Sequence, residues 1–535
     1  MADNPPLHRV APRSQLRDGV PLRVEAGDTP VLLIRDGDAV HAYQADCPHA
    51  GAPLDQGAVC GGRLICPWHK ATFDVQRGAL LEPPALHGLA RYRVELRGDD
   101  VLVSTDTPTP APALEQTRDA GEGRHFAIVG AGAAGAAACA ALRELGFRGR
   151  IALLDHETTT PYDRTALSKF VPSGELAPRD VYPLLEDDFF ARHDVERRRA
   201  NVVALDAAAR EIRLDGGTPL RYDAALVATG SVPKPPPIRG IDDAAVRARV
   251  VMLRNLDDAT RLDALAAGRG RAVVIGSSFI GLEVASALRK RGVEVTVVSP
   301  EPVPFAKQFG RETGALFMQL HRQNGTALAM DTQVDAIEPG SGADALIVRT
   351  KDGLRIACDF VVAGTGVAPA TAFVEGVARN DDGGLNVDAS MRVCDGLYAA
   401  GDVACFEARG GGGGRGPRLR IEHWRVAQQQ ARAAARGMLG MAARQPSVPF
   451  FWTYHYGKRF DYLGHAKAGD WDTCVTIGSP AQYAFVTLYG RDGMLVAALG
   501  CQRESRIARL AEAMRAPLST DDARRIVDER DGQRP

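Results

Sequence analysis

Four residues able to bind a metal occur in two short motifs near the N-terminus. Cys47 and His49 form C-x-H, and after sixteen intervening residues Cys66 and His69 begin and end a C-x-x-H motif. Two thiolates and two imidazoles from two loops are able to ligate one zinc ion. They are also able to hold a two-iron cluster, with Cys47 and Cys66 on one iron and His49 and His69 on the other. The spacing predicts a metal centre and leaves both alternatives open.

The sequence around these ligands resembles Rieske ferredoxin-type domains. CPHAGAPLDQG (47–57) and CPWHKATFDVQRGALLEPPA (66–85) carry the resemblance, which extends over most of residues 5–104. It implies an all-β domain that holds a [2Fe–2S] cluster. High-potential relatives have a disulfide at the positions of Ala52 and Trp68, so the resemblance implies a lower-potential, ferredoxin-like centre. We also expect at least one of the two histidines to present an edge to solvent as an electron exit.

A glycine-rich turn indicates a second chemistry, the binding of a dinucleotide. Gly130, Gly132 and Gly135 form G-x-G-x-x-G between an apolar strand and an Ala-rich helix. The first glycine permits the tight turn, the second lets a pyrophosphate approach the backbone, and the third lets helix and strand pack closely. A ribose-binding acid is expected about 20 residues further on. Asp155 and Glu157 both meet that spacing, and the choice between them stays open.

A second turn of this kind predicts a second dinucleotide. It consists of Gly276, Ser278 and Gly281, with Ser at the middle position, and we include Glu283 of the following helix in the site. A serine there crowds a phosphate but is also able to hydrogen-bond to it. Glu301 lies twenty residues after Gly281, where it is able to accept from a ribose 2′-OH, and no Arg follows directly. These features favour NADH over NADPH. The alternative to a second dinucleotide site is a strand–helix turn that binds no ligand.

Five further segments resemble the flavoprotein ferredoxin reductases of oxygenase systems and the related apoptosis-inducing-factor-like proteins. They occur in the family's order: PYDRTALSK (161–169), LVATGSVP (226–233), VVAGTGVAP (361–369), LYAAGDVA (397–404) and IEHWRVAQQQARAAARGML (421–439). The resemblance runs from about residue 124 to 480. It implies a bound FAD and a diffusing nicotinamide. PYDRTALSK contains no Cys, so no redox-active thiol pair is expected beside the flavin.

The same resemblance implies roles for single residues. Asp402 is expected at the flavin ribityl chain, Arg164 and Lys169 near the flavin, and Trp424 beside the isoalloxazine. Arg164, Lys169 and Trp424 are therefore our candidates for a catalytic role. The segments imply four further cofactor-binding residues: Thr229, Gly230, Gly366 and Gly401. Outside the motif set, Asp402 would be interpreted as a helix cap and Trp424 as a core residue. His423 is interpreted as a surface or packing histidine, because hydride transfer depends on stacking geometry more than on acid–base help.

The expected fold class is multidomain. An all-β Rieske domain precedes an α/β flavoprotein with FAD and NAD dinucleotide-binding domains and a C-terminal α+β interface domain. The expected boundaries are 1–106 for the Rieske domain, 107–123 for a linker, 124–248 with 370–445 for the FAD-binding domain, 249–369 for the NAD(P)-binding domain and 446–535 for the C-terminal domain. The Pro- and Thr-rich linker is typical of a flexible segment, which would let the Rieske domain either dock or swing. The Gly-rich stretch 408–420 is expected to be a surface loop.

Composition and charge exclude several classes of function. The 535 residues include 65 basic and 66 acidic side chains, a balance that argues against binding to a nucleic acid. The N-terminus lacks the apolar segment of a secretory signal. The longest apolar run, 126–142, is shorter than a membrane span needs. Nine Cys, mostly isolated in apolar segments, suit a reducing cytosol, so a cytoplasmic protein without a membrane span is expected.

These features together predict an NAD(P)H-dependent oxidoreductase. Electrons would pass from NADH through FAD to the built-in [2Fe–2S] cluster, and on to an acceptor protein such as an oxygenase or another ferredoxin. One alternative is an NADH-binding redox sensor with low turnover. Another is a catalytically silent scaffold with zinc at the four-ligand site. The family resemblance is also compatible with a homodimer.

Overall fold

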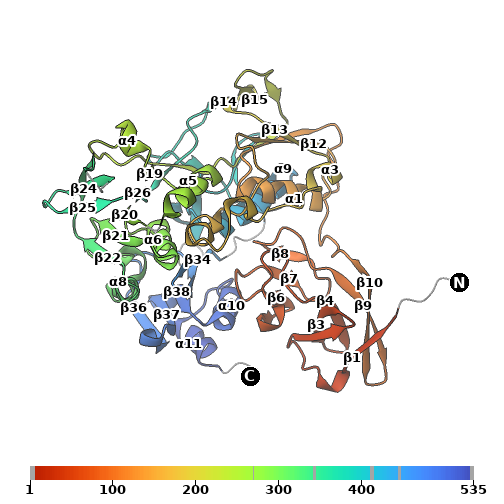
Figure 1. Ribbon diagram of the computed structural model, residues 1–535. Helices are drawn as coiled ribbons and strands as arrows, with labels where there is room; N and C mark the ends of the chain where they lie inside the picture. Colours follow the sequence, from red (N-terminus) through yellow and green to blue (C-terminus); the bar gives the residue numbers. More distant parts are fainter. Residues whose placement is uncertain (1–5, 269, 342–344, 410–414, 444–447, 530–535) are drawn as a thin grey trace.

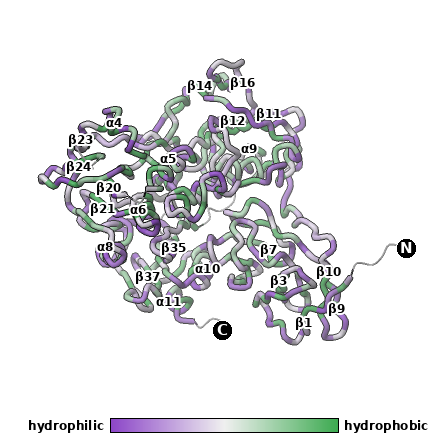
Figure 2. The backbone as a smooth tube through the Cα atoms, viewed as in Figure 1, coloured by the Kyte–Doolittle hydropathy of each residue, from purple (hydrophilic) through white to green (hydrophobic). Residues whose placement is uncertain are grey.

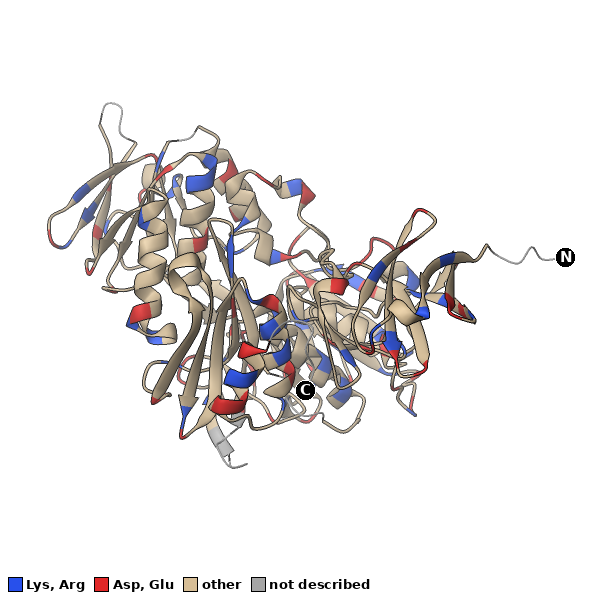
Figure 3. Ribbon diagram, turned by 90° about the horizontal axis from the view of Figure 1, so that it is seen from below, with Lys and Arg blue, Asp and Glu red and all other residues tan. Residues whose placement is uncertain are grey.

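The computed structural model describes residues 6–268, 270–341, 345–409, 415–443 and 448–529. A β-rich N-terminal module lies beside a larger α/β part, and the C-terminal sheet with its helices adjoins both (Figure 1). Hydrophobic residues follow the strands and helices of the interior, whereas many peripheral turns are hydrophilic (Figure 2). Basic and acidic residues are interspersed over both parts (Figure 3), in line with the formal net charge of −1.

The N-terminal module contains two antiparallel sheets. The larger has the strand order β1-β10-β9-β4-β3-β2 and the smaller the order β5-β6-β7-β8. In β3, Val31 and Leu33 pack into one hydrophobic cluster while Leu32 and Ile34 pack into another, because successive side chains point to opposite faces. The strands are β1 (His8–Pro12), β2 (Leu22–Ala26), β3 (Thr29–Asp36), β4 (Ala39–Gln44), β5 (Ala58–Cys60), β6 (Arg63–Ile65), β7 (Thr72–Asp74), β8 (Leu80–Glu82), β9 (Arg91–Arg97) and β10 (Asp100–Thr109).

The first α/β sheet has the order β13-β12-β11-β17-β31-β30 and is parallel except for β30. Helices α1 and α9 pack against each other through small residues, since alanine allows a close approach and favours the helix. The elements are β11 (His125–Val129), β12 (Arg150–Asp155), β13 (Val195–Arg199), β17 (Ala224–Val227), β30 (Arg392–Cys394), β31 (Leu397–Ala399), α1 (Ala133–Glu144) and α9 (Trp424–Met438).

The second α/β sheet is parallel, with the order β19-β26-β20-β21-β22. Its elements are β19 (Val250–Val251), β20 (Arg271–Ile275), β21 (Glu294–Ser299), β22 (Ala327–Met330), β26 (Phe360–Ala363), α5 (Leu256–Ala266), α6 (Phe279–Arg291) and α8 (Arg311–Gln323). Helix α6 follows the second glycine-rich turn, as the sequence predicts for a strand–turn–helix unit.

The C-terminal sheet, β34-β35-β38-β37-β36, is antiparallel and buried on both faces. Phe460 packs with Phe317 of α8 on one face, while Phe450 packs with Ile507 of α10 on the other. The elements are β34 (Phe450–His455), β35 (Lys458–Gly464), β36 (Thr473–Ser479), β37 (Ala484–Arg491), β38 (Met494–Cys501), α10 (Glu504–Ala513) and α11 (Thr520–Asp528).

Shorter elements connect these sheets. They are α2 (Phe170–Ser173), α3 (Phe189–Arg192), α4 (Ala244–Arg247), α7 (Ala306–Phe309), β14 (Val202–Asp206), β15 (Glu211–Leu214), β16 (Leu220–Arg221), β18 (Ser231–Pro233), β23 (Val334–Pro339), β24 (Leu346–Thr350), β25 (Arg355–Cys358), β27 (Val367–Pro369), β28 (Val374–Glu375), β29 (Leu385–Asn386), β32 (Ala404–Arg409) and β33 (Arg415–Leu419). Within the described ranges, no helix is long and apolar enough to cross a membrane.

The segment expected to be a flexible linker is held against the α/β part. Its first residues continue β10 as far as Thr109. Further along, the Thr117 amide donates to the Leu145 carbonyl at 2.7 Å, and the Glu115 carboxylate pairs with Arg436 at 2.6 Å. Residues 444–447, where a domain boundary was expected, and 410–414 of the Gly-rich stretch lie outside the described residues.

Candidate functional site

A cavity of about 940 Å³ lies between the two α/β sheets and strand β34. Its volume falls in the range of small-molecule and cofactor sites. Twelve of the residues predicted from the sequence line it: Gly130, Gly132, Asp155, Glu157, Arg164, Lys169, Thr229, Gly230, Glu283, Gly401, Asp402 and Trp424. Six predicted residues do not: Gly135, Gly276, Ser278, Gly281, Glu301 and Gly366.

The first glycine-rich turn forms an open cradle at the edge of this cavity. Gly130 has a φ of +102°, and a Cβ there would meet the Ala228 carbonyl oxygen at 2.5 Å. A Cβ on Gly135 would collide with the Gly130 carbonyl oxygen, so this glycine is needed for packing. At Gly132, by contrast, the nearest atom to a Cβ would be Arg164 Nε at 4.0 Å. The backbone at Gly132 therefore faces open space, as close approach of a diphosphate requires.

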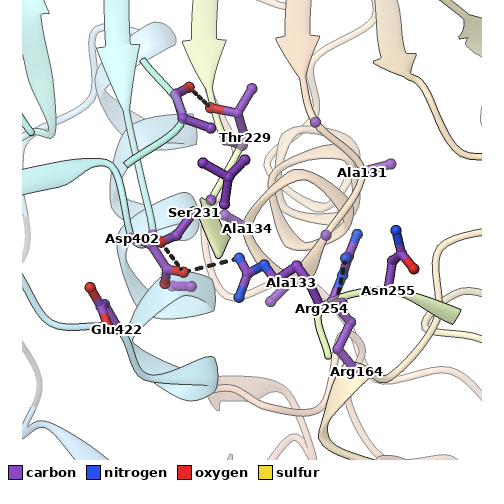
Figure 4. Close-up of a pocket in the computed structure, with 18 of the residues that line it drawn as sticks. Ala131, Ala133, Ala134, Arg164, Thr229, Ser231, Arg254, Asn255, Asp402 and Glu422 are labelled. Carbon is purple, nitrogen blue, oxygen red and sulfur yellow. Dashed lines mark hydrogen bonds and ion pairs between the residues drawn. The ribbon is translucent and has the colours of Figure 1, made fainter. Parts of the chain in front are cut away.

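Two guanidinium groups place positive charge in the cavity. Arg254 Nη2 lies 3.1 Å from Asp402 Oδ2, which also accepts from the Ser231 hydroxyl at 2.8 Å (Figure 4). Arg164 Nη1 donates to the Arg254 carbonyl oxygen at 3.2 Å. Sequence reasoning missed Arg254. Its only local signal is its place directly before the Asn255–Asp258 capping box of α5. Two cations beside a glycine cradle suit a diphosphate.

The two candidate ribose acids stand together at the carboxyl end of β12. Asp155 is the last residue of the strand and pairs with Arg197 at 3.1 Å. Glu157 pairs with Arg164 at 2.5 Å and accepts from the Tyr162 hydroxyl at 2.6 Å. Both carboxylates line the cavity. The structure places both acids at the cavity edge, so the choice that the sequence left open stays open.

Lys169 forms a buried ion pair at the cavity wall. Its ammonium lies 2.9 Å from Glu283 Oε2, and both side chains are less than a tenth exposed. The Ser168 hydroxyl donates to the same carboxylate oxygen at 2.5 Å. Glu283 was expected in the nicotinamide site and indeed lines the cavity, but its carboxylate faces Lys169 rather than open space. A buried charge of this kind is stable because it is paired and hydrogen-bonded.

Trp424 begins α9 and lines the cavity next to His423. Its indole Nε1 and the Nδ1 of His423 are buried, and neither has a hydrogen-bond partner among the described residues. Burial, and then the nearby His465, lower the pKa of His423 to about 3, so this ring is neutral. His423 is thus a packing histidine, as expected, since its ring packs against Phe451. Unpartnered polar atoms at the cavity wall fit a cofactor that would supply partners.

The second glycine-rich turn is built like the first but differs at its serine. The Ser278 hydroxyl accepts from the Gly281 amide at 3.3 Å and donates to the Gly364 carbonyl oxygen at 3.2 Å. It therefore acts as the N-cap of α6 rather than being left free for a phosphate. Glu301 is paired with Lys307 at 2.6 Å, so a lysine six residues further along the chain stands beside this acid although no Arg follows it directly.

The four expected cluster ligands come together on two loops. Cys47 and Cys66 are 3% and 1% exposed, and backbone amides of the two loops, such as those of Ala50 and Trp68, donate to the two sulfurs. The Nδ1 atoms of His49 and His69 face each other at 3.1 Å. Thiolates that accept amide hydrogen bonds, opposite two imidazole nitrogens, suit a two-iron cluster.

In the described ranges, no three His, Cys, Asp or Glu are grouped as for a single ion. Each of the two ligand loops is closed by a hydrogen bond of its own backbone. The Cys47 and Cys66 amides donate to the Ala52 and Ala71 carbonyl oxygens, each at 2.8 Å.

The histidine edge of this centre faces the α/β part. The His69 ring packs on Trp452 with the centroids 4.1 Å apart, and Trp452 lines the cavity. His49 Nε2 lies 3.8 Å from Asp163, and the His49 side chain is only 8% exposed. The His49 side chain therefore shows little surface to solvent. The expectation that at least one of the two histidines presents an edge to solvent stays a prediction, because His69 is half-buried. Trp452 and Asp163 are distant in sequence from the two histidines, so no local pattern indicated these contacts.

Buried charges fix the N-terminal module in this position. Lys70 is fully buried and its ammonium lies 2.8 Å from Asp461 Oδ2 of β35. Arg425 of α9 donates to the Pro83 carbonyl oxygen at 2.7 Å and to the Lys70 carbonyl oxygen at 3.1 Å. Burial lowers the pKa of Arg425 to about 10, a shift that Glu82 opposes. The buried charges of Lys70 and Arg425 are paired across the contact between the N-terminal module and the rest of the chain. The module is therefore docked in this structure.

Comparisons with known proteins agree with these two sites. Residues 124–431 match the family model described as pyridine nucleotide-disulphide oxidoreductase, and residues 7–93 match the Rieske [2Fe-2S] domain. The chain is 31% identical over 513 residues to apoptosis-inducing factor 3 of Mus musculus, covering 93% of this chain and 82% of that protein. It is 34% identical to the anthranilate 1,2-dioxygenase system ferredoxin–NAD(+) reductase component of Burkholderia cepacia, covering 70% of this chain and 89% of that protein.

A solved structure shows the same reductase fold. The covalent putidaredoxin reductase–putidaredoxin complex superposes with a TM-score of 0.69 at 27% identity, over 76% of this chain and 96% of that chain. These matches confirm the multidomain fold class and the expected FAD, NAD(P)H and [2Fe–2S] groups. The chain belongs to the pyridine nucleotide-disulphide oxidoreductase family, as a ferredoxin-reductase-like, FAD-dependent oxidoreductase that carries a Rieske [2Fe–2S] domain.

Proposed function

We propose that this protein oxidises NADH at the cavity and passes the electrons by way of FAD to its own Rieske centre, which reduces an acceptor protein. The observation that carries the proposal is the direct packing of His69 on Trp452, a residue of the cavity wall. A bound FAD supplies the exchange between a two-electron donor and one-electron acceptors. The buried contacts of Lys70 and Arg425 support delivery to the chain's own cluster rather than to a separate ferredoxin.

The side chains of the cavity have distinct roles in this proposal. Gly132 with Arg164 and Arg254 would bind the FAD diphosphate, and Asp402 its ribityl chain. Asp155 and Glu157 would supply the acidic edge for the ribose. Trp424 would pack beside the flavin ring, and the Lys169–Glu283 pair would stand beside the reacting end. These assignments account for the lining residues and for the indole N–H that lacks a partner in the described chain.

NADH is the proposed donor because Glu301 offers a carboxylate to a ribose 2′-OH. Lys307 at 2.6 Å already neutralises that carboxylate and would also be able to contact a 2′-phosphate. Phe279 and Ile280 bring the start of α6 to the cavity wall, so a nicotinamide bound at the second turn would enter the cavity there. We expect rates with NADH to exceed rates with NADPH, and Glu301→Gln to narrow that difference.

The terminal acceptor is proposed from the relatives' names alone. Several are reductase components of dioxygenase systems, so an oxygenase or another ferredoxin is the proposed class of partner. A homodimer remains a prediction.

Steady-state reduction of cytochrome c by NADH tests the proposal against the redox-sensor alternative. We expect sustained turnover, and a loss of at least about tenfold in Cys66→Ser, which removes a cluster ligand while leaving the FAD cavity intact. Val59→Ala, in the same small sheet but not a ligand, is the control. Reduction of the flavin by NADH without turnover on any one-electron acceptor would favour the sensor. A Cys66→Ser variant as active as the wild type would show that electrons leave the flavin directly.

A further inference from the structure

A continuous hydrogen-bond chain leaves the cavity wall at Glu283 and crosses the interior of the protein. The Thr453 hydroxyl donates to Glu283 Oε1 at 2.7 Å and lies 2.8 Å from His455 Nε2. His455 Nδ1 lies 3.3 Å from His321 Nε2, and His321 Nδ1 lies 3.3 Å from the Tyr456 hydroxyl. Five side chains from α6, β34, α8 and the turn after β34 thus form one line.

The chain is buried except at its outer end. His455 and His321 are fully buried, Thr453 is 1% exposed and Glu283 is 4% exposed. Tyr456 is half-buried and precedes the exposed Gly457. The line therefore runs from the cavity wall through the interior to Tyr456, whose hydroxyl also lies 2.6 Å from the Thr326 hydroxyl. A row of polar groups this deep costs stability unless it is fully hydrogen-bonded.

Taking the Glu283 carboxylate as an acceptor sets one direction for the donors of this chain, although the Leu282 carbonyl oxygen is a further acceptor beside His455. The Glu283 carboxylate, paired with Lys169, accepts from Thr453. Thr453 then accepts from His455, so His455 carries its proton on Nε2 and accepts at Nδ1. His321 must therefore also carry its proton on Nε2 and accept from Tyr456. Burial lowers the pKa of His455 to about 3, helped by the Lys169 charge, so this ring is neutral with one donor and one acceptor.

The reaction needs such a path. NADH releases NAD⁺, one proton and two electrons, and one-electron acceptors take the electrons without the proton. A hydride that enters the cavity brings negative charge next to Glu283, which increases the proton affinity of that carboxylate. The N-terminal module contacts this region where His69 packs on Trp452. The buried chain gives the Glu283 carboxylate a path for protons that does not pass through the cavity.

We propose that Glu283, Thr453, His455, His321 and Tyr456 form a proton relay between the cavity and the surface. When the hydride arrives, Tyr456 gives its proton to His321 Nδ1, and His321 passes the proton of its Nε2 to His455 Nδ1. His455 then passes the proton of its Nε2 to Thr453, and Thr453 passes its own to Glu283, while water reprotonates Tyr456. When two electrons leave, the steps reverse. The reversal returns the relayed proton from Glu283 to water, and the hydride-derived proton leaves to the water of the cavity itself. Each cycle therefore takes up one proton, releases two, and gives NAD⁺, one net proton and two electrons.

This inference rests on the proposed reduction of the cavity's cofactor by NADH, and its first test does not. Nitrogen NMR of full-length protein with ¹⁵N-labelled histidine reports each ring's tautomer, with signals assigned by His321→Gln and His455→Gln. We expect both rings to be neutral with Nε2–H at pH 7. Thr453→Val should shift both toward Nδ1–H. The control Thr487→Val removes a buried hydroxyl whose partner among the described residues is Thr476, and should change neither ring. An Nδ1–H tautomer in the wild type, or a His321 signal unaffected by Thr453→Val, would overturn the relay.

The second test measures proton uptake in stopped flow, with a pH indicator in weak buffer, while NADH bleaches the flavin anaerobically. Wild type and Thr487→Val should take up the proton as fast as they bleach. Thr453→Val and Tyr456→Phe should reach the same amplitude at least about tenfold more slowly, and Glu283→Gln should lose that amplitude. The proposal would be overturned if Thr453→Val and Tyr456→Phe both took up the proton at the wild-type rate. An unchanged amplitude of proton uptake in Glu283→Gln would also overturn it.

These experiments distinguish a failure of the proton relay from a failure of the proposed function. Tyr456→Phe removes only a half-buried hydroxyl, so it tests the relay even where Thr453→Val fails to retain FAD. Where NADH does not bleach the flavin, the proposed function fails. Dithionite then replaces NADH as reductant, and the relay is still supported or refuted by the same rates and amplitudes.

Discussion

Replacing Asp461 by Asn should undock the Rieske module from the reductase. Asp461 Oδ2 lies 2.8 Å from the Lys70 ammonium, and the two side chains are 4% and 0% exposed. Without the carboxylate charge, the ammonium keeps only carbonyl oxygens, that of Pro67 at 2.5 Å being the nearest. Breaking one side of a buried pair costs about 3–5 kcal/mol. That energy corresponds to an increase in the undocked population of roughly 150- to 4,000-fold.

Hydrogen–deuterium exchange of the holoprotein measures that population. Amides of the cluster loop 66–71 and of strand β34 should exchange faster in Asp461→Asn by a similar factor, because exchange tracks the open population when opening is rapid. Asp100→Asn is the matched control, since Asp100 pairs with Arg9 at 2.6 Å but both side chains are exposed. Such a pair contributes about 0–1 kcal/mol. Equal exchange in the two variants would refute the view that buried charge holds the module docked.

Further measurements test other parts of the structure. Arg254→Leu should weaken FAD binding by roughly 10- to 150-fold, the worth of a charge-assisted hydrogen bond, in a titration of apoprotein with FAD, and unchanged affinity would exclude Arg254 from the site. His423 and His455 have pKa values of about 3 because they are buried, so below pH 6.5 the unfolded chain binds protons that the folded chain does not. The free energy of unfolding should therefore fall by about 3 kcal/mol between pH 7.5 and 5.5, about half from each ring, and continue to fall toward pH 3. A loss of half that size would show that one of the two rings is charged when folded. A thiol reagent at pH 8 should modify the exposed Cys474 but not Cys139, whose pKa burial raises to about 12, and mass mapping of a labelled Cys139 would contradict its burial.

The sequence was most informative where chemistry and local structure share a few neighbouring residues. The two glycine-rich turns, their strands and their helices follow from the backbone needs of glycine and from hydrophobic patterning. The cluster ligands also lie within two short loops, so spacing and resemblance identified them. The first turn lines the cavity, as expected, because its strand ends there.

Local sequence patterns could not identify the residues that tertiary packing brings to the site. Arg254 lies in the loop between β19 and α5 of the second α/β sheet and pairs with Asp402 of the first. Trp452 of β34 packs against His69 of the N-terminal module. Ser278 was expected beside a phosphate, yet its hydroxyl caps α6, because a helix start with free amides needs an acceptor. The linker composition suggested a flexible tether, but Glu115 and Thr117 bond to the reductase part, so composition did not decide its mobility.

Internal electron transfer is tested by an anaerobic NADH titration followed by optical spectra and electron paramagnetic resonance. We expect the flavin absorbance to bleach and a reduced Rieske signal to appear with it. The cluster ligand His69 packs on Trp452 of the cavity wall, so no second protein is needed for this step. A bleached flavin beside a cluster that stays oxidised, although dithionite reduces it, would contradict internal electron transfer.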